Sequence, residues 1–396
     1  MTKKGQRHAI TAAILLLITV YGFTNTFQSV VMNQVVDSYG LSGGQQGILS
    51  SVINIGSIVA LLSATVLQGR MRKMNILFFA TILQALAFGA LGIPGKLGSM
   101  LIIGVVLGLG FGWTDTYCNS AMVDVHSERS PQFLGLLHGG FGVGSLLCPL
   151  VVSALLLISS WRHISLYMGI LMVVAAVLFW LLGLNADRGT HSIQPDNKLS
   201  LSQVAGYLGS SRNILVISAG VFYAATQTGL TVWLVRYMTL QYDAERLGAT
   251  ALSIYWICAT ASRFIAPRIR LRPLVLFLLG VFLSSIFQTI GVLMGNPVLM
   301  CVMVGCIGMV TGQCIPMLIG ESTRGYEGIT ALPTSVVLFM LCIARILTPL
   351  VMGVISDGVS VSTAMLLPAV TGLLAALFAF AGLRAPMPAG NVIAKS

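Results

Sequence analysis

Long apolar runs separated by short polar segments recur along the whole chain. Each run holds about 20 residues or more, the length that an α-helix needs to cross the hydrocarbon core of a bilayer. Because a membrane-spanning backbone must satisfy its own hydrogen bonds, the pattern predicts an all-α membrane protein with 12 transmembrane helices. The runs lie at 9–35, 45–68, 75–94, 99–123, 132–158, 163–185, 213–239, 247–268, 273–294, 297–320, 331–355 and 361–384.

The longest polar segment follows the sixth run. It predicts an N-terminal six-helix bundle over 1–185, a cytoplasmic central loop over 186–212 and a C-terminal six-helix bundle over 213–396. The halves share short sequences in the same order. GLGFGWT in the fourth run corresponds to GCIGMVT in the tenth, and CPLV in the fifth to TPLV in the eleventh. The order of these matches indicates two pseudo-symmetric halves from a duplicated unit.

Charge is scarce and unevenly placed. The chain is 56% hydrophobic and 8% charged, with a net charge of +11. Most of the 22 Lys and Arg residues, Arg263 among them, fall at those ends of the runs that are cytoplasmic if the N-terminus is inside. The positive-inside rule therefore predicts a multi-pass protein of the cytoplasmic (inner) membrane with both termini in the cytoplasm. The basic charge thus points to topology and the lipid bilayer, and no nucleic acid partner is expected.

Several classes of chemistry have no motif in the chain. There is no G-x-x-x-x-G-K-[ST] for nucleotide phosphates, no zinc-ligand spacing and no nucleophile elbow. All 7 cysteines lie in apolar runs, which argues against a disulfide framework or a metal site. We therefore expect no enzyme activity, no cofactor and no metal, and we expect a monomer.

One acid lies well inside a predicted span. In GLGFGWTDTYCNSAMVD (108–124), Asp115 lies near the middle of the run and Asn119 follows one helical turn later on the same face. A charge at that depth costs about 2.5–3.5 kcal/mol on insertion scales, and desolvation favours the protonated form of a carboxylic acid. Asp115 is therefore predicted to carry a coupling proton or to bind substrate. The alternative is an acid locked to a neighbouring helix.

Other polar residues at similar depth are candidate substrate contacts. Arg345 could anchor an anionic substrate, pair with Asp115 or form part of a gate, and His138 lies among glycines in the fifth run. Amides with aromatic rings suit hydroxyl-rich ligands, although a single amide more often makes an interhelical bond. The candidate substrate-binding set is Asn25, Gln28, Asn119, His138, Tyr223, Gln227, Trp233, Trp256, Gln313 and Arg345.

Two basic segments occupy equivalent places in the halves, QGRMRK (68–73) and APRIRLR (266–272). They could pair with acids such as Asp124 or Glu321 and close the cytoplasmic side, or they could serve only as topology anchors. The predicted cytoplasmic gate consists of Arg70, Arg72, Asp124, Arg268 and Arg270.

These features resemble the major facilitator superfamily over essentially the whole chain, and within it the fucose permease branch of sugar:proton symporters. DTYCN (115–119) is similar to that branch's E-T-A-A-N, which would put Asp115 at its proton-linked glutamate. YAATQTG (223–229), LVRY (234–237), SRF (262–264) and TPLVMGVISD (348–357) resemble further motifs of the branch. The resemblance implies proton symport, with a substrate site between the halves near the membrane midplane.

The chain also departs from that pattern. Ser29 stands where the permease has an aspartate, His138 replaces a glutamine, and Phe141 replaces an asparagine. Ile315 stands at an expected tyrosine, and Arg345 at a glycine. The predicted cavity is therefore less sugar-like than that of the family, and fucose as the substrate does not follow.

Together the observations predict a proton-coupled secondary transporter for a small polar solute, most simply a sugar or sugar-like compound, working by alternating access. Two alternatives remain: efflux of drug-like or lipophilic compounds through a Met-rich apolar cavity, and import of an organic anion bound by Arg345. A non-transporting receptor is disfavoured because the chain shows no sizeable soluble segment.

Overall fold

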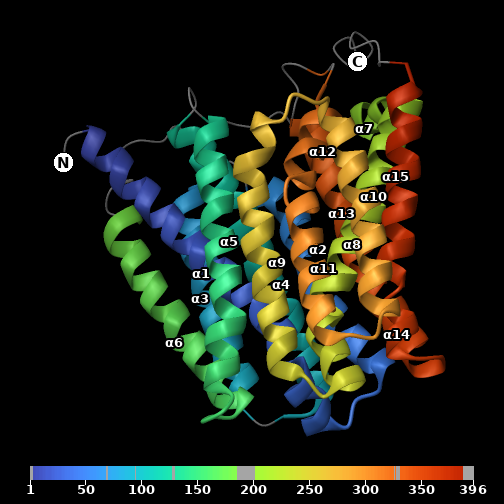
Figure 1. Ribbon diagram of the computed structural model, residues 1–396. Helices are drawn as coiled ribbons and strands as arrows, with labels where there is room; N and C mark the ends of the chain where they lie inside the picture. The colour runs from blue at the N-terminus through green and yellow to red at the C-terminus, as the bar shows by residue number, and fades with distance from the viewer. Residues whose placement is uncertain are drawn as a thin grey trace. The chain divides into compact units, whose positions relative to one another are not determined.

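The computed structural model describes residues 3–67, 70–93, 95–126, 130–184, 201–324, 326 and 331–386. All regular elements in these ranges are helical (Figure 1). They are α1 Lys3–Tyr39, α2 Gly43–Leu67, α3 Lys73–Gly92, α4 Leu97–Val125, α5 Ser130–Leu155, α6 Trp161–Phe179 with a π-helical turn Trp180–Leu184, α7 Leu201–Leu208, α8 Ser211–Tyr242, α9 Glu245–Ile265 with a 3₁₀ turn Ala266–Arg268, α10 Pro273–Leu293, α11 Pro297–Thr311, α12 Cys314–Ser322, α13 Ala331–Gly358, α14 Val361–Ala364 and α15 Leu367–Arg384.

The chain forms two compact units. The first comprises Met1–Leu41 and Ile48–Asp196, and the second comprises Ser42–Gly47 and Asn197–Ser396. The first turn of α2 is counted with the second unit, where the Asp357 carboxylate accepts hydrogen bonds from Gly43 N (2.6 Å) and Gly44 N (2.7 Å). A carboxylate at these otherwise unpaired N–H groups caps the helix favourably.

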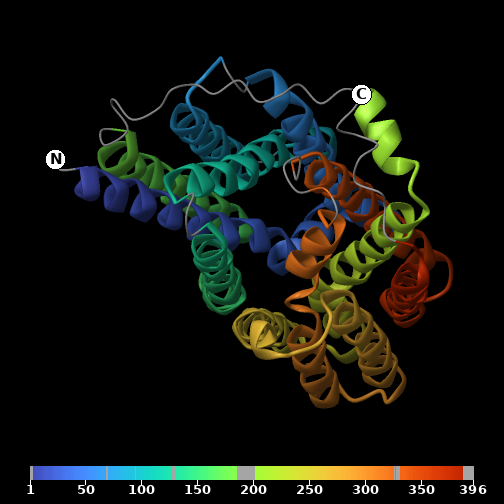
Figure 2. The same ribbon diagram turned by 90° about the horizontal axis from the view of Figure 1, so that it is seen from above.

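In the first unit, α1 packs along α5, and α3 packs against both α4 and α6 (Figures 1 and 2). The side chains of one buried cluster come from all six helices α1 to α6, and include Ile14, Leu77, Cys118, Leu137 and Phe179. Small residues allow close approach at some crossings. A Cβ added at Gly108 of α4 would clash with the Ile53 carbonyl oxygen of α2, so only glycine fits there.

The second unit repeats these helix pairings. In the first unit the first spanning helix contacts the fifth, and the third contacts both the fourth and the sixth. The corresponding contacts in the second unit are those of α8 with α13 and of α10 with both α11 and α15. Its buried cluster includes Tyr223, Phe277, Leu318 and Leu341. The matching set of pairings supports the predicted duplication of a six-helix unit.

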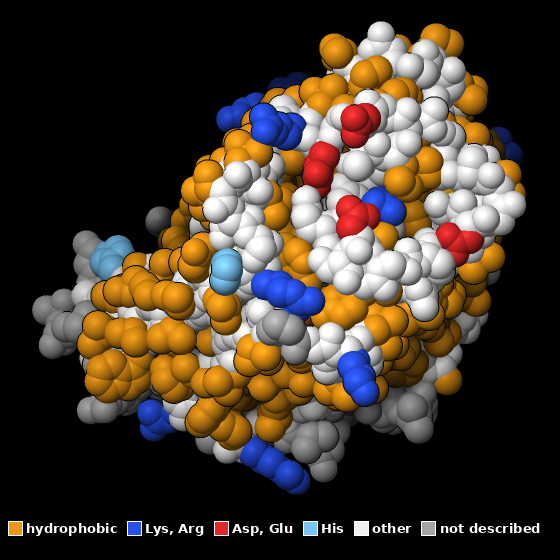
Figure 3. All heavy atoms as spheres, turned by 90° about the horizontal axis from the view of Figure 1, so that it is seen from below, with side chains coloured by type: hydrophobic (Ala, Val, Ile, Leu, Met, Phe, Trp, Pro, Cys, Tyr) orange, Lys and Arg blue, Asp and Glu red, His pale blue; other side chains and the backbone are white. Residues whose placement is uncertain are grey.

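The described residues contain eleven helical spans that are long and apolar enough to cross a membrane, where α11 with α12 counts as one span and α14 with α15 as another. Many large apolar side chains on them are exposed, as Ile102 and Ile170 are, which suits lipid contact. Figure 3 views the protein from below and shows hydrophobic side chains over much of the surface, with Lys, Arg, Asp and Glu side chains between them.

The run predicted at 247–268 is present as a helix, α9, which is less apolar than the eleven spans because it contains Glu245, Arg246, Arg263 and several hydroxyl groups. One sequence expectation differs from the structure. The predicted loop 186–212 contains a helix, α7, whose Tyr207 side chain is fully buried in the second unit. Residues 186–200 of that predicted loop lie outside the described residues.

Candidate functional site

Asp115 lies half-buried on α4, ten residues before the helix ends at Val125. At 1.5 Å per residue the carboxyl-bearing turn is about 15 Å from that end, inside the span. The Asn119 side-chain amide donates to Asp115 Oδ1 (3.1 Å) and to the Asp115 backbone oxygen (2.8 Å). The predicted shared face of these two residues is thus present, and the amide stabilises one orientation of the carboxyl.

Aromatic rings join the neighbouring turns of α1, α4 and α5. The Tyr21 ring lies 5.4 Å from that of Phe111 and 5.3 Å from that of Phe141, measured between centroids. Phe111 precedes Asp115 by one turn, and Phe141 follows His138 by three residues. The ring cluster therefore holds the turn with Asp115 and the turn with half-buried His138 against α1.

The two amides predicted on α1 have different settings. Gln28 Nε2 donates to the Leu49 backbone oxygen of α2 (3.1 Å), which is an interhelical bond. Gln28 also lines an apolar pocket of the first unit, together with Phe27, Phe88 and Phe111. Asn25 lies half-buried on α1, three residues earlier. In the first unit the candidate site is therefore centred on the hydrogen-bonded pair Asp115 and Asn119.

The second unit has its polar centre where one spanning helix is interrupted. Helix α11 ends at Thr311 and α12 begins at Cys314. Pro316 has no N–H to donate to the Gly312 carbonyl four residues earlier, so that carbonyl needs another partner. A Cβ at Gly312 would clash with the Ala259 carbonyl oxygen of α9, so glycine here allows α9 to pack against the break.

Side chains from α8, α9 and the break itself bond the carbonyls at this interruption. Tyr223 OH donates to Thr311 O (2.9 Å), Arg263 Nε to Gly312 O (3.0 Å) and Gln313 Nε2 to Val310 O (2.7 Å). Arg263 was expected only as a loop cation at the cytoplasmic end. The structure instead directs it at the polar centre, and the sequence signal for this was Pro316, whose missing donor leaves the Gly312 carbonyl to be satisfied.

Further predicted contacts surround this centre. Gln227 Nε2 donates to Tyr255 OH (3.2 Å), and the Trp256 ring lies 5.2 Å from that of Tyr255. Ser262 donates to Gln313 Oε1. Trp233 is fully buried on α8, and among the described residues its Nε1 has no hydrogen-bond partner.

Arg345 is half-buried near the middle of α13. The structure therefore brings Tyr223, Gln227 and Gln313 into one network of the second unit. The roles predicted for Arg345 and Trp233 stay predictions.

One of the predicted gate residues, Asp124, forms an ion pair with a basic segment. In the first unit Asp124 pairs with Lys73 Nζ (2.8 Å), the last residue of the basic segment 68–73, and Lys73 also donates to Ser120 Oγ (2.6 Å). Arg70 and Arg72 of the same segment are exposed. In the second unit Arg268 and Arg270 are likewise exposed.

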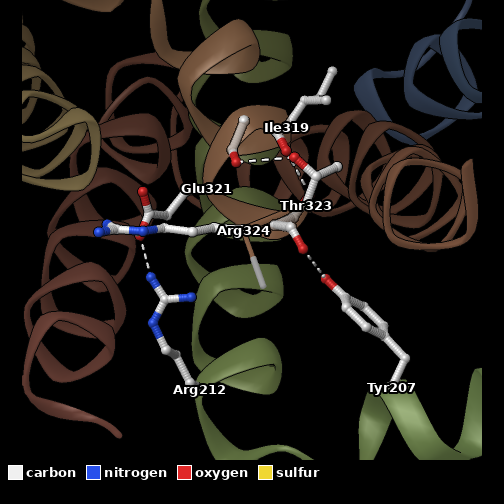
Figure 4. A network of polar contacts seen from close by, with 8 residues as sticks. Tyr207, Arg212, Ile319, Glu321, Thr323 and Arg324 are labelled. Atoms are coloured by element: carbon white, nitrogen blue, oxygen red, sulfur yellow. Dashed lines mark hydrogen bonds and ion pairs between the residues drawn. The ribbon is translucent and has the colours of Figure 1, made fainter. Parts of the chain in front are cut away.

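Glu321, the other acid that could pair with the basic segments, pairs instead with an arginine at the start of α8. Buried Arg212 donates to the Glu321 carboxylate, and Arg324 lies 3.5 Å from the same oxygen atom (Figure 4). Beside this pair Tyr207 OH donates to Ser322 O (3.1 Å), which attaches α7 to the end of α12 (Figure 4). Burial raises the pKa of Tyr207 well above its usual range.

A second arginine cluster lies at the start of α1 and was not predicted. Arg7 Nε donates to His126 Nδ1 (3.2 Å), and His126 Nε2 lies 2.7 Å from Thr11 Oγ1. The His126 ring stacks on Phe133 with centroids 3.3 Å apart. Burial, with Arg7 and His8 beside it, holds the pKa of His126 below its usual range, so the ring is neutral near pH 7.

The comparisons with known proteins agree on the fold. A bacterial homologue of the human lysosomal transporter Spinster, in an inward-facing and occupied conformation, is similar with a TM-score of 0.78 at 15% identity, covering 96% of this chain and 97% of that one. Its unoccupied form gives 0.77 at 16% identity over 96% and 97% of the chains. The nucleoside transporter NupG gives 0.74 at 13% identity over 96% and 99%. A search of curated protein sequences finds no match.

The sequence profile that describes the Major Facilitator Superfamily matches residues 14–331, which is most of the chain. This agrees with the helical architecture, with the paired six-helix units and with polar residues held inside spanning helices. The chain belongs to the Major Facilitator Superfamily and is a multi-pass secondary transporter, not an enzyme.

Proposed function

We propose that this protein is a proton-coupled transporter that moves a small, hydroxyl-rich solute across the cytoplasmic membrane by alternating access. Both termini lie in the cytoplasm in this proposal, as the basic loops predict. Asp115 carries the proton, and Asn119 holds its carboxyl in place. The solute contacts come from the polar residues inside the spans, among them Gln227, Tyr223 and Gln313.

The single observation that carries the proposal is the setting of Asp115. Among the described residues it is the only Asp or Glu away from the ends of its helix by more than two turns. An ionisable group at such depth is expensive and is a functional candidate by default. Protonation removes its charge, so proton uptake and a conformational change that alters its hydration are energetically linked.

The solute class follows from the kind of polar groups and from the likeness of Asp115–Asn119 to the sugar symporters. Amides donate and accept hydrogen bonds, and rings such as those of Tyr255 and Trp256 pack against apolar faces of sugars. The amide and hydroxyl groups in the spans favour a polar solute over the lipophilic compounds of an efflux pump. Efflux of hydrophobic dyes from liposomes would favour the pump instead.

The experiment compares Asp115→Asn with the wild type in proteoliposomes. We expect the variant to keep solute counterflow, because the site still binds and reorients, and to lose accumulation driven by an imposed pH gradient. Asp243→Asn is the matched control, since Asp243 is an exposed acid at the α8–α9 junction with a φ of 50°, which asparagine tolerates. Concentrative uptake by Asp115→Asn at the wild-type level would remove Asp115 from the coupling mechanism.

A further inference from the structure

We propose that Arg162 binds the phosphate of an anionic phospholipid whose acyl chains lie along the exposed apolar side chains of α3 and α6. The site belongs to the first unit alone, and it does not depend on the proton and solute sites proposed above. Three features carry the proposal: a guanidinium held in a fixed position, exposed apolar stripes that end beside it, and a positive charge around it.

The Arg162 guanidinium is held in place by the ends of three helices. Its central carbon lies 4.4 Å from the centroid of the Trp161 ring and 5.3 Å from that of the Tyr39 ring, so the cation rests on two aromatic faces. Arg162 Nη2 donates to Tyr39 OH (3.0 Å) at the end of α1, and Nη1 donates to Ile93 O (3.4 Å), just after α3. Trp161 is fixed in turn, because its Nε1 donates to Ser38 Oγ (2.9 Å). A side chain that is already fixed loses little conformational entropy when it binds a ligand.

The same guanidinium still presents charge and donors to a ligand. An arginine has five N–H groups, and the bonds to Tyr39 and Ile93 use one group on each terminal nitrogen. Within the described part of the chain its contacts are two rings, a hydroxyl and a carbonyl, all of them neutral. The side chain is half-buried, so water and lipid reach it. The planar group therefore suits the anionic oxygens of a phosphate ester.

An exposed apolar stripe runs along α6 from Arg162. The side chains that follow at spacings of three or four residues share one face of the helix, and they are Leu166, Ile170, Val173 and Val177. From Arg162 to Val177 this stripe is about 22 Å long at 1.5 Å per residue. Half of the hydrocarbon core of a bilayer is about 15 Å thick. An acyl chain whose headgroup is at Arg162 can therefore lie along the stripe over its whole length.

Helix α3 contributes a second stripe beside the first. Its exposed apolar side chains are seven residues apart, about two turns, and they are Phe79, Leu86 and, directly after the helix, Ile93. Helices α3 and α6 pack together, and a Cβ added at Gly92 would clash with Leu166, so they approach closely beside Arg162. Two apolar stripes that end at one cation match two acyl chains that are joined at one phosphate.

The charge at this end of the first unit favours an anion. The charged residues described here are two cations, Arg162 and Lys96, and one acid, Asp37, with exposed His163 beside them. Lys96 is exposed and follows Ile93 by three residues, so the two Cα atoms lie within about 11 Å of each other. Aromatic residues such as those under the guanidinium are enriched at the boundary between membrane and water, where lipid phosphates lie.

The test compares phosphatidylglycerol with phosphatidylcholine, which share a phosphate and acyl chains but differ in net charge. Each lipid is titrated into the purified full-length protein in a neutral detergent, and the unfolding temperature is measured. Phosphatidylglycerol should raise that temperature more than phosphatidylcholine does. Arg162→Gln should weaken the binding of phosphatidylglycerol by about fivefold, because one basic residue near an anionic headgroup contributes a factor of that size. Arg162→Lys keeps the charge but loses the planar donors, and should bind with intermediate affinity.

Arg246→Gln is the matched control. It removes an exposed arginine in the first turn of α9, in the other unit, and should leave the affinity for phosphatidylglycerol unchanged. An equal loss in this control would show a general attraction of anionic lipid to basic residues and would overturn a site at Arg162. If Arg162→Gln does not fold, Arg162→Lys decides, and a wild-type affinity of that variant would overturn the proposal.

A third probe, glycerol phosphate, separates a lipid from a soluble phosphate. It carries the anionic headgroup without acyl chains, so it should not stabilise the wild type at concentrations at which phosphatidylglycerol does. Equal stabilisation by glycerol phosphate would mean that the apolar stripes take no part in binding, which contradicts a lipid site. Equal stabilisation by phosphatidylglycerol and phosphatidylcholine would contradict the role of charge.

Discussion

The first and fourth spanning helices of each unit are joined at their predicted cytoplasmic ends by an arginine, yet the arginine has a different partner in each. In the first unit Arg7 of α1 bonds to neutral His126, just after α4. In the second unit Arg212 of α8 pairs with the Glu321 carboxylate in the last turn of α12. Both units thus have a side-chain cross-link between the first and fourth spanning helices, but the partner of the arginine is a neutral histidine in one and a carboxylate in the other.

The difference matters because a histidine side chain ordinarily changes charge near pH 6.5, within reach of mild acid. In the first unit Arg7 occupies Nδ1, so the neutral ring carries its proton on Nε2, next to Thr11 Oγ1. Protonating Nδ1 would set a second positive charge against Arg7. Mild acid therefore weakens the first cross-link.

The largest effect is expected when the buried ion pair is broken. Glu321→Gln keeps the shape of the side chain but leaves the Arg212 charge buried without its counter-ion, which typically costs about 3–5 kcal/mol. We expect a clearly lower unfolding temperature of the purified protein. Arg324→Gln is the control, because the Arg324 side chain is 54% exposed and its interaction is screened by water.

The double variant Arg212→Met/Glu321→Leu sharpens this test. Replacing both members of a buried pair by apolar residues is often neutral, so most of the stability should return. If Glu321→Gln unfolds at the wild-type temperature, the pair does not stabilise the second unit and the contrast between the two cross-links fails.

A smaller, pH-dependent effect is expected in the first unit. The pKa of His126 is lower in the folded protein than in the unfolded chain, so the unfolded chain takes up the proton first. The contribution of His126 to stability is therefore present above about pH 6.5 and is lost as the pH falls below it, by at most about 1.4 kcal/mol per pH unit.

The measurement is the unfolding temperature at pH 7.5 and pH 5.5. His126→Gln removes the titrating ring, so the variant should be less stable than the wild type at pH 7.5 and should lose less on acidification. Equal losses in the two proteins would show that His126 does not titrate with unfolding.

The smallest effect is expected for the ion pair between Lys73 and Asp124. Both side chains are partly exposed, at 28% and 38%, and exposed pairs contribute about 0–1 kcal/mol. Asp124→Asn should lower the unfolding temperature slightly at low salt and not measurably at high salt, because salt screens exposed charges. A large loss that persists at high salt would mean that this pair behaves like the buried one.

Much of the architecture is readable in the sequence. The apolar runs predict the spans because a bilayer demands about 20 apolar residues with an internally bonded backbone. Asp115 and Asn119 were predicted on one face because a helix places residues i and i+4 there, and their hydrogen bond confirms it. These features depend on helix periodicity and on the apolar interior of the bilayer, and both leave a pattern that can be recognised in a single sequence.

The polar centre of the second unit was only partly predictable. The sequence identifies Gln227, Tyr223 and Gln313 as polar residues within spans. It places Arg263 among the cations at the cytoplasmic ends, because Arg263 lies two residues before the end of α9 at Ile265. Pro316 indicates that the Gly312 carbonyl lacks its helical hydrogen-bond donor, but the neighbouring sequence does not indicate which side chain donates to it. That depends on α9 packing against the interruption at Ala259.

The sequence by itself determined that this chain spans a membrane many times, that it divides into two related halves, and that one acid lies well inside the fourth span. Only the tertiary structure decided which residue meets which: Arg263 at the Gly312 carbonyl, Arg7 at His126 and Arg212 at Glu321. The physical reason is that hydropathy is summed over neighbours in sequence, whereas a buried polar group must find its partner on another helix, more than 45 residues away in each of these cases.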